Sequence, residues 1–256
     1  MRTLISHFYN EEYLLPWWLK HHTELFDHGI LIDRNSTDNS VEICKKIAPH
    51  WEIRTSKVPN FDPIEVDREV MNIEMECSEW KMILNTTEFL CFRDKEEFFS
   101  FLNNLGEEMY SIPIITMVDD PKENYTDPVY ELPLITQRYH GYFPYNPHQP
   151  YIGRFIHKYL HGNYTAGRHH TAHKFIVYPN SAFIMKFTYS PWNDFMKKRK
   201  LQIGPTLPIH SIQQGLGTQH VVSAKELDIN FIKMAEGTQD LRLILEYQKI
   251  FSLHNK

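Results

Sequence analysis

Cysteine is scarce in this sequence, and long apolar runs are missing. The three cysteines, Cys44, Cys77 and Cys91, are odd in number and show no Cys-x-x-Cys spacing, which argues against a disulfide framework and a zinc ribbon. No apolar run approaches the length of a membrane-spanning helix, and the run at residues 3–8 is too short for a signal peptide. We therefore expect a protein of a reducing compartment, with a cytoplasmic location as the simplest prediction.

Positive charge is not in excess either. The 27 Lys and Arg residues face 32 Asp and Glu residues, for a formal net charge of −5. This balance argues against binding of nucleic acid or a membrane surface through bulk charge, so we expect no nucleic-acid partner. The one tight basic cluster, residues 197–200, is most simply a solvated helix face. The alternative is contact with an anionic acceptor or a lipid headgroup, which leaves peripheral membrane contact open.

Glycine is also uncommon, with 10 residues against 15 prolines and 15 histidines, while aromatic residues make up 14% of the chain. Aromatic and histidine side chains suit a cleft that stacks sugars or bases, but they suit an aromatic-rich core equally well. At 256 residues the chain is long enough to bury a substantial core. The amino-acid composition therefore does not distinguish between classes of function. The order and spacing of the sequence motifs are more informative.

The first half of the chain alternates between apolar strands and amphipathic helices. Strands are predicted at residues 3–8, 29–33, 51–54 and 80–84, and helices at residues 11–25, 38–47 and 63–78. Asn10 is a suitable N-cap for the first of these helices. The alternation predicts an α/β fold with a mostly parallel central sheet and helices on both faces.

The second half is less regular. We predict a helix at residues 96–105 and strands at residues 111–118, 130–138, 174–178 and 182–187. Residues 139–170 are rich in Tyr, His, Pro and Gly, which indicates a long functional loop or lid. Helical pattern dominates from residue 224 onward. The predicted organisation is an α/β domain at residues 1–223 with a C-terminal helical extension of the same domain at residues 224–256.

Polar residues stand where three of the predicted parallel strands end. Asn10 follows the first strand closely, Asp33 closes the second, and residues 85–88 follow the strand at 80–84. Ligands of parallel sheets collect at the carboxyl ends of the strands. The sequence therefore predicts a ligand site at this edge of the sheet.

The same segments fall into three blocks. Residues 8–22 contain Asn-Glu-Glu and then Trp-Leu-Lys-His-His, residues 33–40 read Asp-Arg-Asn-Ser-Thr-Asp-Asn-Ser, and residues 85–90 read Asn-Thr-Thr-Glu-Phe-Leu. In this order and spacing they resemble the first part of family-2-like glycosyltransferases with the A-type fold, including the group related to family 92. The resemblance covers roughly the first 95 residues and is vague beyond them.

The resemblance implies a Rossmann-like fold and an enzyme, a hexosyl- or pentosyltransferase, that takes a nucleotide-sugar donor. It implies that Asp33 and Asn35 contact the nucleotide base, while the backbone around Tyr9 and Asn10 closes over it. Glu11 either orients this loop or is a first-turn partner of the helix dipole.

The third block departs from the family's Asp-x-Asp-Glu-Phe-Leu pattern, in which the aspartates hold a divalent metal against the sugar diphosphate. Asn85 and Thr87 stand in their places, and only Glu88 is acidic. Mn²⁺ and Mg²⁺ prefer carboxylate oxygen, so metal use is uncertain here. Three outcomes are open: Glu88 binds metal with help from a histidine such as His210 or His220, Arg and Lys side chains neutralise the diphosphate instead, or binding is kept without catalysis.

Four further residues complete the predicted site. Arg168 and Lys174 lie in a run of basic residues and are the predicted contacts to the diphosphate or acceptor, with ordinary loop polarity as the alternative. Asp119 and Asp120 follow an apolar strand. One of them, with Asp120 preferred, is the predicted base that takes the acceptor's proton, and a surface turn before a proline is the alternative.

Together these features predict a glycosyltransferase that moves a sugar from a nucleotide-sugar donor to a glycan or glycolipid acceptor. Inversion at the sugar is implied by the resemblance to family 2 alone. The competing hypothesis is a catalytically silent module that binds nucleotide sugars or glycans on the same fold. A histidine-rich metal hydrolase is the weaker third hypothesis, because the sequence has no His-Glu-x-x-His motif.

Overall fold

The computed structural model describes residues 1–144, 153–179 and 181–251. The strands are β1 Thr3–Phe8, β2 His28–Asp33, β3 Glu52–Thr55, β4 Lys81–Ile83, β5 Glu88–Phe92, β6 Met109–Val118, β7 His140–Tyr142, β8 Gly153–His157, β9 Ile176–Val177, β10 Ala182–Tyr189 and β11 Gln239–Asp240. The helices are α1 Leu15–Thr23, α2 Ser40–Ile47, α3 Pro63–Glu74, α4 Lys95–Asn104, α5 Leu134–Gln137, α6 Asp194–Leu201, α7 Ile209–Gln213, α8 Ala224–Ala235 and α9 Leu245–Phe251, with short 3₁₀ turns at Gly204–Thr206, Thr218–His220 and Leu241–Leu243.

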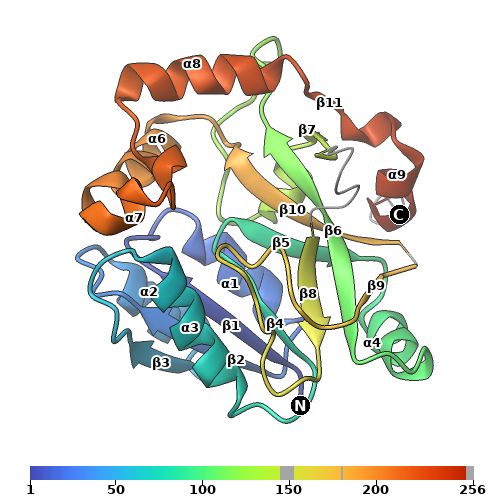
Figure 1. Ribbon diagram of the computed structural model, residues 1–256. Helices are drawn as coiled ribbons and strands as arrows, with labels where there is room; N and C mark the ends of the chain where they lie inside the picture. Colours follow the sequence, from blue (N-terminus) through green and yellow to red (C-terminus); the bar gives the residue numbers. More distant parts are fainter. Residues whose placement is uncertain (145–152, 180, 252–256) are drawn as a thin grey trace.

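The main sheet runs in the order β11-β7-β6-β8-β4-β1-β2-β3. Strands β3, β2, β1 and β4 are parallel, as the alternation of strands and helices predicts. Strands β8, β7 and β11 pair antiparallel with their neighbours, so the mixed half of the sheet lies beyond β4. The α/β class and the parallel core of the sheet are therefore confirmed, and Figure 1 shows both halves.

Helices cover both faces of the parallel strands. Leu4 and Leu31 point to one face, where they pack with residues of α1 and α2. Ile5 and Ile32 point to the other face and pack with Val70 of α3. This division follows from the alternation of side chains along a strand.

The stripe of apolar residues on α1 is buried as predicted, but the helix begins later than expected. Leu14, Trp18, His22 and Phe26 are all at most 2% exposed. Helix α1 begins at Leu15, and Asn10 is not its cap, because Asn10 has a positive φ of 51°. A loop therefore separates β1 from α1, and this loop forms part of the site described below.

Strand β6 joins the two halves of the molecule. Its first half, from Met109 to Pro113, pairs with β8, while its second half pairs in parallel with β10. Strand β10 in turn pairs antiparallel with β5. The turn between β4 and β5 therefore lies where the parallel strands meet the second group of strands.

Two predictions for the second half are wrong. Residues 130–138 form no strand; they hold a loop and the short helix α5. Residues 139–170 are not one long loop, because they contain β7 and the central strand β8, while residues 145–152 of that segment lie outside the described residues. The helical extension also contributes strand β11 and the buried side chains of Leu241, Tyr247 and Ile250.

None of the helices in the described ranges is long and apolar enough to cross a membrane. The basic cluster at residues 197–200 lies on α6, which together with α7 covers the edge where the parallel strands end (Figure 1). Gln202 just after α6 donates to the carbonyl of Asn10 at 2.7 Å, and Arg34 donates to Thr206 Oγ1 at 3.1 Å. The segment from α6 onward thus closes over the strand ends.

Candidate functional site

The carboxyl ends of β1, β2 and β4 meet at one edge of the sheet. Phe8 is level with Asp33, because β1 and β2 are parallel neighbours, and β4 flanks β1 on its other side. Asn10, Asp33 and Asn85 follow or end these strands directly. The structure therefore brings the three predicted segments together at the edge where parallel sheets bind ligands.

Hydrogen bonds join the loops that follow β1 and β2. The backbone N–H of Asn10 donates to Ser36 Oγ at 2.9 Å, and Thr37 N donates to Asn10 Oδ1 at 2.7 Å. Asp33 Oδ1 accepts from Ser36 N at 3.0 Å, while its Oδ2 has no partner among the described residues. Asn35 is exposed and has a positive φ of 55°. One oxygen of Asp33 and the Asn35 amide are thus available to a ligand.

Glu11 lies beneath this loop and is paired. Its carboxylate accepts from Arg199 Nε at 2.5 Å and from the Arg199 NH2 group at 2.6 Å, while its backbone N–H donates to Ser40 Oγ at 2.8 Å. Glu11 is 5% exposed. Its contacts fasten α6 to the loop, which agrees with an orienting role and leaves its carboxylate little room for a ligand.

Arg34, which the sequence analysis missed, lies beside Asp33 without an ion-pair partner among the described residues. Its guanidinium is 4.5 Å from the ring centre of Tyr9 and 5.5 Å from that of Phe61. Arg34 is 3% exposed and its Nε has no hydrogen-bond partner. Burial lowers the pKa of Arg34, although Tyr9 and Asp33 oppose that shift. The signal in the sequence is an arginine directly after a strand-end aspartate.

The carboxylate of Glu88, at the end of the Asn85–Glu88 turn, points into the protein interior. Glu88 is fully buried, and its two oxygens accept from Arg154 Nε at 2.9 Å and from the Arg154 NH2 group at 2.7 Å. The backbone N–H of Asn85 donates to Glu88 Oε2 at 2.9 Å, and Lys186 Nζ lies 3.7 Å from Oε1. Burial opposes ionisation of Glu88, but the charges of Arg154 and Lys186 outweigh it and lower the pKa to about 2. Thr87 is 8% exposed, and its carbonyl accepts from Phe187.

Arg168 reaches Asn85 from the second half of the chain. It forms a buried ion pair with Asp67 of α3 and donates to Asn85 Oδ1 at 2.7 Å. Gly167 strengthens the same anchor, since its N–H donates to Asp67 and its carbonyl accepts from Arg154. Arg168 therefore lies beside the altered motif, while its contact with the diphosphate or acceptor stays a prediction. No local pattern in the sequence could have identified Asp67 as its partner.

Lys174 is placed differently. Its side chain is exposed and has no hydrogen bond or ion pair with any residue in the described ranges. The structure therefore does not bring Lys174 into contact with Arg168 or the Asn85–Glu88 turn. Its predicted role rests on sequence position alone.

Two lysines add further positive charge, Lys186 beside Glu88 and Lys200 in the field of Lys186. Lys186 shares Glu88 with Arg154, and Lys200 Nζ lies 4.3 Å from the ring centre of Tyr189. Burial lowers the pKa of both lysines; with Arg199 and Lys186 nearby, the pKa of Lys200 falls to about 7. Positive charge thus exceeds negative charge around the turn.

Two histidines lie in the same electrostatic environment. Burial, then the charges of Arg154 and Lys186, lowers the pKa of His169 to about 3. Burial, then Lys200, Arg199 and Lys186, lowers the pKa of His220 to about 4. Both imidazoles are therefore neutral at physiological pH.

We use the name cationic cleft for the set of five positively charged side chains Arg34, Arg154, Arg168, Lys186 and Lys200.

The candidate metal ligands do not form a metal site. His210 Nε2 lies 2.7 Å from Asp62 Oδ2, the cap of α3, and the His220 ring packs against Phe61. The carboxylate of Glu88 is held by Arg154. In the described ranges no three His, Cys, Asp or Glu side chains are grouped so that they could hold a metal ion. A divalent ion does not fit these residues as they are arranged.

Asp119 and Asp120 lie at the end of β6. Asp119 is 7% exposed, accepts from Trp192 N at 2.8 Å and lies 3.5 Å from the Arg138 guanidinium. Burial raises the pKa of Asp119 above its usual value, despite the opposing effect of Ser190 and Arg138. Asp120 is more accessible and accepts from Lys122 N. Asp119 thus closes the turn after β10, and of the two only Asp120 is open to solvent.

The solved structures named below resemble this chain only at low sequence identity. No family model matches this sequence, and no curated protein matches it. S. aureus TarS residues 1–349 give a TM-score of 0.43 at 10% identity, over 80% of this chain and 65% of that one. Glucosyl-3-phosphoglycerate synthase from Mycobacterium tuberculosis, in complex with Mn²⁺, UDP and phosphoglyceric acid, gives 0.35 at 13% identity, over 62% of this chain and 55% of that one. Core-mannan synthase A from Aspergillus fumigatus, in its Mn/GDP form, gives 0.29 at 14% identity, over 47% and 43%.

In each of these comparisons the chain spans less than two thirds of the length of the matched structure. With TM-scores below 0.5, the likeness does not bear on the activity of this chain. Its function has to be argued from its own residues.

The buried pair of Glu88 and Arg154 leads to a prediction about stability. We expect Glu88→Gln to lower the free energy of unfolding by about 3–5 kcal/mol, because it leaves Arg154 buried without its counter-charge. The matched control is Glu97→Gln, which breaks the half-exposed pair with Arg93 and should cost less than about 1 kcal/mol. Urea unfolding at neutral pH measures both changes.

The sign of the pH dependence follows from the lowered pKa of Glu88. Its pKa lies below that of an unfolded glutamate, so its stabilisation is present above about pH 4.5 and is lost as the pH falls toward 2. The difference in stability between wild type and Glu88→Gln should therefore shrink in acid. Equal losses for Glu88→Gln and Glu97→Gln would contradict the assignment of Glu88 to a buried structural pair.

Proposed function

We propose that this protein is a glycosyltransferase that moves a sugar from a nucleotide-sugar donor to a glycan or glycolipid acceptor, and that it binds the donor diphosphate without a divalent metal. The observation that carries the proposal is the cationic cleft, where Arg34 and Lys200 have no ion-pair partner among the described residues and Lys186 has to share Glu88 with Arg154. Such a cleft suits a doubly charged phosphate ligand.

The nucleotide base has a place at the β1 and β2 loops. Asp33 Oδ2 has no partner in the described part of the chain and can accept a base N–H, while Asn35 lies exposed beside it. The Tyr9 ring, stacked on Arg34, forms the adjoining wall. A planar base with N–H donors therefore fits this end of the cleft, and the diphosphate would extend toward Asn85 and Lys186.

Sugar transfer requires stabilisation of the leaving group. As the acceptor oxygen bonds to the anomeric carbon, the bond from that carbon to phosphate breaks, and the nucleoside diphosphate departs with the electron pair. Lysine and arginine groups held in place by the fold stabilise the charge that develops on the diphosphate. In the cleft, Lys186 and Lys200 are the groups for this role, and Arg168 orders Asn85 beneath them.

The acceptor's proton needs a base. Asp120 stays the predicted base, because it is accessible at the end of β6, whereas the bonds of Asp119 to Trp192 and Arg138 indicate a structural role. An inverting reaction would place this base on the side of the sugar opposite the leaving diphosphate.

A catalytically silent module that binds nucleotide sugars is the second candidate. One observation favours it: the acid of the altered motif, Glu88, is buried and paired, so it cannot take part in chemistry. The two candidates differ in turnover and share donor binding.

The first test uses a panel of nucleotide sugars in EDTA and in Mn²⁺. We expect a rise in melting temperature with one donor, and slow donor hydrolysis, at similar levels in both buffers. Lys200→Met should weaken donor binding by about tenfold or more, because a charge-assisted bond to phosphate is lost. The control Lys197→Met removes a charge from the outer side of the same helix, where Lys197 pairs with Asp228, and should leave affinity unchanged.

Each outcome of this test has a meaning. Binding only in the presence of Mn²⁺ would refute the metal-free cleft. Donor binding without turnover, even with candidate acceptors, would favour the silent module. No response to any nucleotide sugar would refute the proposed function altogether.

Donor affinity should also depend on pH through Lys200. Its pKa of about 7 means that the ammonium form is only partly populated in the free protein at neutral pH. A bound diphosphate favours the charged form, so binding takes up a proton above pH 7, and affinity should fall by up to about tenfold per pH unit there. Calorimetry with a nucleotide sugar from pH 6 to pH 9 measures this slope, which should be flat in Lys200→Met.

The base pocket is tested by Asp33→Asn. The amide oxygen can keep the bond from Ser36 N, but the amide nitrogen cannot accept a base N–H. We expect donor affinity to fall by about tenfold or more, while Asp38→Asn on the same loop has little effect. Unchanged binding in Asp33→Asn would remove this residue from the base pocket.

A further inference from the structure

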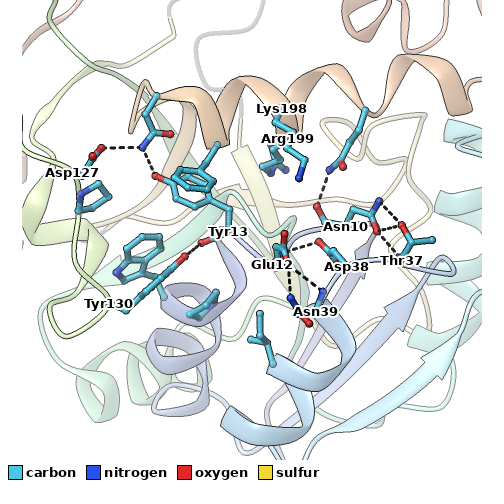
Figure 2. Close-up of a pocket in the computed structure, with 17 residues that line it drawn as sticks. Asn10, Glu12, Tyr13, Thr37, Asp38, Asn39, Asp127, Tyr130, Lys198 and Arg199 are labelled. Carbon is cyan, nitrogen blue, oxygen red and sulfur yellow. Dashed lines mark hydrogen bonds between the residues drawn. The ribbon is translucent and has the colours of Figure 1, made fainter.

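A hollow lies beside helix α6, which also carries Lys200 of the cationic cleft. It is a cavity of about 830 Å³ between α1, the start of α2, α6 and the loop that carries Asp127 and Tyr130. Figure 2 shows Tyr13, Tyr130 and Asp127 at one end and Asn10, Asp38 and Thr37 at the other. Its volume is in the range of ligand-binding pockets.

Aromatic rings line one end of the cavity. Tyr13 and Phe195 stack with their centres 5.3 Å apart, and Trp17 and Tyr130 lie 4.0 Å apart. The polar atoms of these rings are already used, since Trp17 Nε1 donates to the carbonyl of Val129 and Tyr130 Oη donates to that of Tyr13. The rings are therefore fixed in position, and Phe195, 63% exposed, offers its surface to a ligand.

Hydrogen-bonding groups line the other end. Glu12 Oε2 accepts two bonds from Asn39, while Glu12 Oε1 has no partner in the described ranges. Lys198 points toward this end from α6 (Figure 2), and its ammonium forms no ion pair with a described residue. A ligand bound here would meet one hydrogen-bond acceptor, Glu12 Oε1, and one donor, the Lys198 ammonium, which have no partner among the described residues.

The charges of the lining select the class of ligand. Glu12, Asp38 and Asp127 face Lys198 and Arg199, and Arg199 is already neutralised by Glu11. The cavity therefore has no excess of positive charge for a phosphate, which the neighbouring cleft favours instead. Its carboxylates equally disfavour a purely apolar ligand. A neutral polyhydroxylated ligand fits both ends, because its C–H faces lie on aromatic rings and its hydroxyls reach polar groups.

We propose that this cavity binds neutral sugar units of the acceptor. The acceptor role rests on the proposed function, whereas saccharide binding itself rests on the lining of the cavity. Asn10 and Arg199 line the cavity, and Lys200 follows Arg199 directly on α6, so an acceptor held here lies next to the proposed donor site. The site lies on the side of α1 and the start of α2.

The test uses neutral oligosaccharides of glucose, galactose, mannose and N-acetylglucosamine, with binding followed by calorimetry and by intrinsic tryptophan fluorescence. We expect Phe195→Ala to weaken binding of the recognised oligosaccharide by about three- to tenfold, the contribution of one aromatic contact. The control is Phe175→Ala, because Phe175 is also an exposed aromatic residue, 42% exposed, but lies outside the cavity against Phe155. Nucleotide-sugar affinity and melting temperature should stay unchanged in both variants.

The outcomes separate this inference from the proposed function. Equal effects of Phe195→Ala and Phe175→Ala, or no oligosaccharide binding by the wild type, would overturn the saccharide site even if a nucleotide sugar binds. Oligosaccharide binding that depends on Phe195, without any response to nucleotide sugars, would support the saccharide site and overturn its role for an acceptor. Dependence on Phe195 together with donor binding supports both.

Discussion

The buried carboxylate of Glu88 is the interaction on which the candidate site depends. It holds Arg154 of β8 with two hydrogen bonds, and it accepts the N–H that closes the turn at Asn85. Arg154 in turn holds the carbonyl of Gly167, next to Arg168, which reaches back to Asn85. One negative charge in the interior thus organises the turn and the loop that crosses it. Because the negative charge of Glu88 is taken up by Arg154 and the turn, other positive side chains of the cationic cleft remain available to a ligand.

This arrangement differs in kind from a metal site. A divalent ion brings its charge from solution and is held by carboxylates, whereas the charges of the cationic cleft belong to side chains of the protein, such as Lys186 on β10 and Lys200 on α6. Burial lowers the pKa values of Lys186 and Lys200, and neighbouring positive charges lower them further. In the proposed function, a bound diphosphate would offset these charges.

The sequence was sufficient for the parts of the fold that depend on local pattern. The parallel strands and the stripe on α1 could be read from periodicity, and the meeting of Asn10, Asp33 and Asn85 followed from the rule for strand ends. Strand β8 was missed because its buried residues include Arg154 and His157, which pair with Glu88 and with Glu74 far away in the chain. A buried ion pair makes a strand hard to predict from the sequence, because each of its charged residues taken alone resembles a surface residue. For the same reason Asp67 and Lys200 could not be recognised before the chain was folded.

Helix α6 contributes side chains both to the cationic cleft and to the cavity. Lys200 lies on the side of the cleft, Lys198 and Phe195 lie on the side of the cavity, and Arg199 fastens the helix to Glu11 between them. A ligand that shifts this helix from one side therefore changes the surface offered on the other. By thermodynamic linkage the effect is mutual, so a ligand on either side changes the affinity for a ligand on the other side by the same factor. An eight-residue helix would in this way couple the two sites.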